Sequence, residues 1–134
     1  MQRMDRAYVL VGLVWLVFGM SYGIWMGITE QFNFANSHAH ANLVGFVASV
    51  LFGLIYRAYP SLAQSRLATI QFAVYEIGAV LLVAGKAVVD SGGGNSLVKG
   101  GSLVVLVGAV LMLAIFAMAD RTADDVSPAG RGAH

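Results

Sequence analysis

The sequence contains no cysteine and few charged residues, and each shortage excludes a class of protein. Without cysteine the chain cannot form disulfides, thiolate metal sites or iron–sulfur clusters, and it cannot attach c-type haem covalently. Charged residues make up 11% of the chain, which is too few to cover the surface of a soluble domain. The formal net charge is +1, and we expect no nucleic acid among the partners.

Apolar residues fill the chain instead, at 58% of the total. A helix needs about 20 mainly apolar residues to cross a bilayer, and four segments have this length, 7–28, 38–59, 67–89 and 97–119. Short polar connections separate them, so neighbouring helices are expected to be antiparallel. We therefore predict an all-α integral membrane protein, an antiparallel four-helix bundle over 1–119 in a lipid bilayer. A polar, disordered tail is expected over 120–134.

The distribution of cations predicts the orientation of this bundle. Only Lys86 and Lys99 flank one side, whereas all the arginines flank the other: Arg3, Arg6, Arg57, Arg66, Arg121 and Arg131. The positive-inside rule then places both termini in the cytoplasm of a bacterial inner membrane. The connection before the second span is expected to face the periplasm, with Asn36 or Ser37 capping the helix that follows.

Small residues recur at every fourth position in the first two spans. Gly19, Gly23 and Gly27 form one such stripe, and the other consists of Gly45, Ser49 and Gly53. Small residues at this spacing allow helix backbones to approach closely. The contacts they make would lie within one chain or across a homodimer, and the sequence alone leaves both arrangements open.

The most informative motif is the pentapeptide from His38 to Asn42, at the outer end of the second span. Two of the three histidines in the chain, His38 and His40, lie in it. Histidine is rare in membrane spans and is the commonest neutral nitrogen ligand for metals and haem iron. Residues two apart on a helix differ by about 200° in direction. We expect His38 on a small, polar face with Asn42, inside the bundle, and His40 on a more apolar face.

The segment that follows carries a resemblance to a known family. His40-Ala41-Asn42-Leu43 begins an apolar run that ends at Tyr59-Pro60. This pattern resembles helix II of subunit I in the haem–copper oxidase superfamily, above all in its nitric oxide reductase branch. In that family the histidine of helix II is an axial ligand of the low-spin haem, near the outer face of the membrane. The resemblance implies that His40 binds haem b.

The resemblance covers about one helix, and the chain departs from the family elsewhere. The family's second axial histidine and its active-site histidines lie on later helices, but no other span here contains a histidine. A binuclear centre that reduces oxygen or nitric oxide is therefore not expected, and no catalytic residue is assigned. The iron would be five-coordinate, or the second ligand would be one of His40 of the partner subunit, His38, Met20, Met26 and Lys86.

Other residues at the depth of the histidines complete the candidate site. Asn42, Tyr22 and Trp25 are expected to line a haem pocket, and Lys86 either pairs with a haem propionate or extends to the membrane interface. Two alternatives remain open for His38 and His40. They bind a different metal, such as copper, or they only contribute to packing and the membrane interface.

Two further polar residues, Gln71 and Glu76, fall within the third span. An ionisable side chain at this depth is costly and is usually paired or functional. Glu76 would act in a proton relay, bind a quinol, or form a hydrogen bond to another helix while protonated. Its neighbour one turn earlier, Gln71, is a candidate for the same polar region.

These observations favour a small membrane protein that resembles a b-type cytochrome. It would transfer electrons or handle a small gas such as oxygen or nitric oxide, as a homodimer, with a quinol or another electron-transfer partner. The first alternative is a structural or assembly subunit without catalysis. The second is a protein that binds or transports a metal ion through His38 and His40, with Glu76 along the path. Whether the chain is an enzyme is left open.

Overall fold

The computed structural model describes residues 3–125, which are helical almost throughout and contain no strand. Helix α1 spans Met4–Thr29. The second span is built from four consecutive pieces, η1 (Phe32–Phe34), α2 (Ala35–His40), η2 (Ala41–Val47) and α3 (Ala48–Ala58). A short turn, η3 (Leu62–Gln64), leads to α4 (Arg66–Asp90) and α5 (Ser96–Asp125). Within the described part of the chain, four helices are long and apolar enough to cross a membrane. The prediction of an all-α protein with four helices long and apolar enough to be spans is confirmed.

Two boundaries differ from the predicted ones. The second span begins at Phe32 rather than at position 38, so the histidine motif lies inside the helix and not at its first turn. Helix α5 continues to Asp125, beyond the predicted start of the tail at position 120. No proline or glycine interrupts the sequence between Ala119 and Asp125, so nothing local stops the helix there. The rest of the predicted tail, 126–134, lies outside the described residues.

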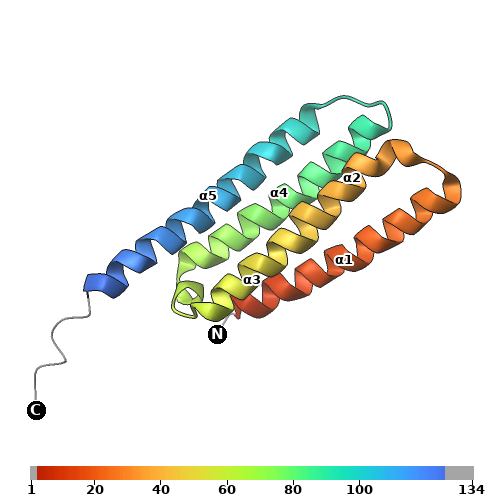
Figure 1. Ribbon diagram of the computed structural model, residues 1–134. Coiled ribbons are helices and arrows are strands. Elements are labelled where there is room, and N and C mark those ends of the chain that lie inside the picture. Colours follow the sequence, from red (N-terminus) through yellow and green to blue (C-terminus); the bar gives the residue numbers. More distant parts are fainter. Residues whose placement is uncertain (1–2, 126–134) are drawn as a thin grey trace, which may run out of the picture.

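The helices pack in a row (Figure 1). Helix α1 packs on η2 and α3, the second span packs on α4, and α5 packs almost only on α4. The start of α1 lies beside the end of α3, because Gly12 contacts Val50 while Gly53 contacts Val9. In the same way Gly85 of α4 contacts Val98 near the start of α5.

Most glycines of the first two spans pack against side chains of the other span in the same chain. A Cβ atom added at Gly12 would lie 2.7 Å from the Val50 side chain, and one at Gly45 would overlap the Trp15 ring. Gly19 faces the Asn42 side chain in the same way. Only Gly27 of the predicted stripes has open space around it. The seam between α1 and the second span is therefore tight, and its glycines accommodate large side chains of the neighbouring helix.

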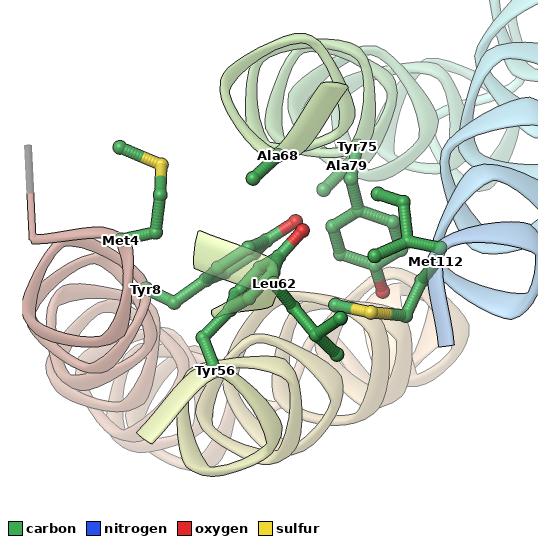
Figure 2. Close-up of a cluster of buried hydrophobic side chains, with 9 residues drawn as sticks. Met4, Tyr8, Tyr56, Leu62, Ala68, Tyr75, Ala79 and Met112 are labelled. Atoms are coloured by element: carbon green, nitrogen blue, oxygen red, sulfur yellow. The ribbon is translucent and has the colours of Figure 1, made fainter. Parts of the chain in front are cut away.

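A buried cluster holds one end of the bundle together (Figure 2). Tyr8 of α1 and Tyr56 of α3 stack with their ring centroids 5.9 Å apart, and their hydroxyl groups lie side by side. Both hydroxyls donate to Gln71 Oε1 of α4, at 2.6 Å and 3.1 Å. The amide of Gln71 donates in turn to the carbonyl oxygen of Gly108 on α5, at 3.1 Å. One fully buried glutamine thus connects all four spans.

Replacing Gly45 with alanine is expected to destabilise the protein, whereas the same change at Gly27 is not. The methyl group at position 45 would overlap the Trp15 ring, and overpacking costs about 1–3 kcal/mol. At Gly27 no atom lies within 4 Å of the added carbon, and alanine is the better helix former. Thermal unfolding in detergent, followed by circular dichroism, measures both variants. Equal melting temperatures would contradict the tight contact between α1 and η2.

Candidate functional site

The entry to the second span is fixed by residues at the end of α4. The Asp90 carboxylate accepts a hydrogen bond from the backbone N–H of Ser37 at 3.0 Å, and the Asn33 side chain donates to the Asp90 carbonyl oxygen at 2.9 Å. The prediction that Asn36 or Ser37 supplies the cap was wrong, because a carboxylate from a distant helix takes that place. Lys86 lies one turn before Asp90, and its Nζ atom is 3.8 Å from the carboxylate. The candidate pocket residue Lys86 is thus an ion-pair partner.

The His38 ring lies in the seam between α1 and α2. It packs against Gly23, where an added Cβ would come within 2.9 Å of the ring. Tyr22 meets the ring edge-on, with centroids 6.1 Å apart, and the Asn42 amide nitrogen is 3.3 Å from His38 Nε2. Trp25 stacks on Tyr22 at 5.8 Å. The candidates Tyr22, Trp25 and Asn42 therefore gather around His38 and not around His40.

The His40 ring lies in a different environment. Its Nδ1 atom is 2.8 Å from the backbone carbonyl oxygen of Asn36, one turn earlier in the same helix. A carbonyl oxygen only accepts hydrogen bonds, so in the neutral ring Nδ1 carries the proton and Nε2 keeps its lone pair. This arrangement leaves one nitrogen available to bind a cation or to accept a hydrogen bond.

An apolar face of the second span that is unpartnered in the single chain lies beside His40. His40 itself is half-buried, whereas the side chains of this adjacent face, at Leu43, Leu51 and Leu54, are about half exposed or more. These residues face the surroundings of the bundle, in contrast to the buried row on the opposite side. The two histidines therefore face different environments, as their spacing of two residues predicts.

A π-helical segment, η2, begins directly after His40. The Tyr75 hydroxyl donates to the carbonyl oxygen of Val44 at 2.8 Å, in the middle of this segment. Single π turns in otherwise regular helices are frequent at functional sites. The small residues that recur in this span are the signal in the sequence for this segment. They lie at every fourth position, at Ser37, Ala41, Gly45, Ser49 and Gly53. All five are buried, and a regular helix with 3.6 residues per turn would rotate such a row away from the core.

The second polar centre surrounds Glu76 on α4. One carboxylate oxygen accepts a hydrogen bond from Ser49 Oγ of α3 at 2.6 Å, and the other accepts one from Trp15 Nε1 of α1 at 3.1 Å. Glu76 therefore links three spans. Gln71 belongs to the tyrosine cluster described above and makes no contact of this kind with Glu76, although the two residues lie five positions apart.

Glu76 also borders a cavity of about 500 Å³ between α1 and α4. Val14 and Val80 are exposed at its rim, so the cavity opens toward the region that lipid would occupy. Its walls are apolar or aromatic apart from this one carboxyl group: Val11, Val14, Trp15, Phe18, Tyr22, Val80, Val83, Ala84 and Ala87. An apolar cavity with a single polar group at one point is typical of a site for a small lipid-soluble molecule.

No protein-family model, curated protein or solved structure matches this chain. The resemblance of positions 40–60 to helix II of the oxidases therefore stays a prediction from the motif. Among residues 3–125, no group of three or more histidine, cysteine or acidic side chains is placed to hold a metal ion. A metal site built from three or more such side chains is thus without support in the described part of one chain.

Replacing Glu76 with leucine is expected to lower the free energy of unfolding by about 1–3 kcal/mol, because the Trp15 and Ser49 donors lose their acceptor. Glutamine at the same position is expected to cost much less. Its oxygen would accept from Trp15 while its amide group donates to the Ser49 oxygen. Chemical denaturation in detergent compares the two variants, and equal losses would show that the hydrogen bonds contribute little.

Proposed function

We propose that the chain forms an antiparallel four-helix bundle in a bacterial inner membrane, with both termini in the cytoplasm. Arg3, Arg57 and Arg66 support this orientation, because they flank the same end of the bundle, at the start of α1, the end of α3 and the start of α4. Lys86 and Lys99 flank the opposite end. Under the positive-inside rule the histidine motif then lies toward the periplasmic face.

We propose that the function of this bundle is to bind haem b through His40. The observation that carries this proposal is the hydrogen bond between His40 Nδ1 and the Asn36 carbonyl oxygen. Histidines that bind metals commonly donate their other ring N–H to a backbone carbonyl, which fixes the tautomer and the orientation of the ring. His40 has this geometry and lies beside an exposed apolar face, whereas His38 is packed between helices. The donor chemistry at position 40 fits a haem ligand.

The second axial ligand is proposed to come from a homodimer. Described residues on the face of His40 include no other histidine, and Lys86 is engaged by Asp90. A two-fold axis beside this face would bring His40 of the partner subunit to the other side of the same haem. The exposed Leu43, Val47 and Leu51 would then be covered by the dimer. The haem would be held between two copies of this helix face.

A haem held in this way supplies one-electron chemistry. Two axial histidines would leave no open position for oxygen or nitric oxide on the iron, so electron transfer is the role we favour over gas handling. The role of the protein would be to fix the two imidazoles and to exclude water from the haem with apolar side chains. A structural subunit is the alternative if no haem binds.

Protein purified from cells with ample haem is expected to show a Soret band that shifts on reduction with dithionite, together with sharp α and β bands. His40→Ala is expected to lose these bands because it removes the axial nitrogen. Absorption spectra of the oxidised and reduced protein measure this, and the haem-to-protein ratio should be close to one haem for each pair of chains.

The control for this experiment is His38→Ala, which removes the histidine in the seam with α1 and leaves the Asn36–His40 hydrogen bond in place. It should keep the spectrum. Wild-type protein without a visible spectrum would reject haem binding, and one haem for each chain in a monomer would reject the shared ligand.

We propose a quinol as the electron donor, bound in the cavity between α1 and α4. The specific observation is a single carboxyl group bordering an apolar, partly aromatic cavity that opens toward lipid. A quinol dissolves in the bilayer, has a flat ring that suits Trp15 and Phe18, and carries hydroxyl donors. Each Glu76 oxygen accepts one hydrogen bond within the protein and keeps a further lone pair for such a donor.

Binding can be followed through Trp15 itself. The chain has two tryptophans, so Trp25→Phe leaves Trp15 as the only one, in the wall of the cavity. A short-chain quinol is expected to quench its fluorescence with saturation. Glu76→Gln should weaken binding about tenfold, because a hydrogen bond to a charged group is worth about 1.4 kcal/mol more than one to an amide.

The matched control is the dimethyl ether of the same quinol, which has the ring and the tail but no hydroxyl donor. It should bind weakly to the wild type and equally weakly to Glu76→Gln. If quinol and ether bind alike, the carboxyl group does not recognise the ligand and the quinol proposal fails, whatever the haem spectrum shows.

A further inference from the structure

A separate hollow, lined by arginines, lies at the end of the bundle opposite the histidines. Arg3, Arg6 and Arg57 line a space of about 290 Å³ together with Val9 and Leu10. Among the residues that the structure describes, no acidic one borders this space. A neighbouring hollow of about 350 Å³ shares Arg3 and Arg57 and is bordered by Asp5. The arginines come from two different spans, the start of α1 and the end of α3.

Asp5 holds two of these arginines in place without neutralising the group. Its carboxylate lies 3.3 Å from Arg57 Nε and 3.6 Å from Arg3 Nη2. The Asp5 side chain is only 14% exposed, whereas those of Arg57 and Arg3 are 64% and 61% exposed. Three guanidinium groups and one carboxylate leave an excess of two positive charges, since 3 − 1 = 2. Guanidinium groups suit phosphate because they donate paired hydrogen bonds to its oxygens.

The hollow has a charged part, formed by the arginines, and an apolar part that lies deeper along the spans. Arg3 directly precedes α1 and Arg57 is in the last turn of α3, so both lie at the ends of membrane spans, at headgroup level. Val9 and Leu10 lie at least one turn deeper in α1, and Leu10 is about half exposed. A soluble phosphate would use only the arginines, whereas a phospholipid would use both parts.

We propose that this hollow binds an anionic phospholipid, with its phosphate between Arg3, Arg6 and Arg57 and an acyl chain along Val9 and Leu10. Basic pockets between spans on the cytoplasmic side are suited to anionic headgroups. The bound lipid would bridge α1 and α3 where Asp5 already joins them, and it would stabilise this end of the bundle. The site is independent of His40 and of the haem proposal.

The test uses the full chain in neutral detergent, with phosphatidylglycerol or phosphatidylcholine of identical acyl chains. Native mass spectrometry measures the fraction of protein that retains lipid, and thermal unfolding measures the gain in melting temperature. Phosphatidylglycerol is expected to be retained preferentially. Arg6→Gln should lower its retention about fivefold, which corresponds to about 1 kcal/mol for one arginine near an anionic headgroup. Arg6 is exposed, so this change leaves the packing of the bundle intact.

Arg66→Gln is the matched control. Arg66 is an exposed arginine that flanks the same end of the bundle but borders neither hollow, so its loss should leave lipid retention unchanged. Leu10→Ser should also weaken retention, because it removes part of the acyl contact. Equal effects of Arg6→Gln and Arg66→Gln would overturn the site in favour of general charge attraction. Displacement of the lipid by millimolar inorganic phosphate would overturn it in favour of a soluble anion.

Discussion

The need to satisfy polar side chains inside an apolar medium is the constraint on which this bundle depends. In lipid no water replaces a lost partner, so each buried donor or acceptor has to find one on another helix. Helix α4 meets this need twice. Gln71 accepts from Tyr8 and Tyr56 and donates to α5, and Glu76 accepts from Trp15 and Ser49. Within the described residues no buried side-chain nitrogen or oxygen lacks a partner.

Some polar side chains are fully engaged in helix packing, whereas others keep an atom that can bind a ligand. His38 lies only two residues from His40, but its ring is packed against α1 and beside Asn42. His40 bonds only through Nδ1 to its own helix, and its second nitrogen has no part in the packing described. The haem proposal therefore rests on the His40 ring nitrogen that makes no hydrogen bond within the described part of the bundle. The same reasoning applies to Glu76, whose remaining lone pairs border a cavity that the packing leaves open.

Periodicity and composition predicted the four spans and the separation of His38 from His40, because both follow from local helix geometry. The glycine stripes predicted close packing, but not that it lies within one chain. What the sequence could not predict depends on residues far apart along it. Asp90 caps a helix 53 positions earlier, Trp15 and Glu76 are 61 positions apart, and Tyr75 bonds to the π segment of another span. No local pattern in the sequence encodes these pairings. In the sequence, the π segment is indicated only by the fourfold recurrence of small residues from Ser37 to Gly53.

The two proposed ligand sites lie at different depths of the second span. Glu76 reaches Ser49 in the buried row of this span, whereas the half-buried His40 lies between that row and the exposed Leu43 and Leu51. Nine residues at about 1.5 Å each separate the depths of His40 and Ser49. Neither site shares a side chain with the other. A substitution at Glu76 should therefore change quinol binding without altering the haem spectrum, and a substitution at His40 should do the reverse. Electrons passing from one site to the other would travel along the π segment, which lies between His40 and Ser49.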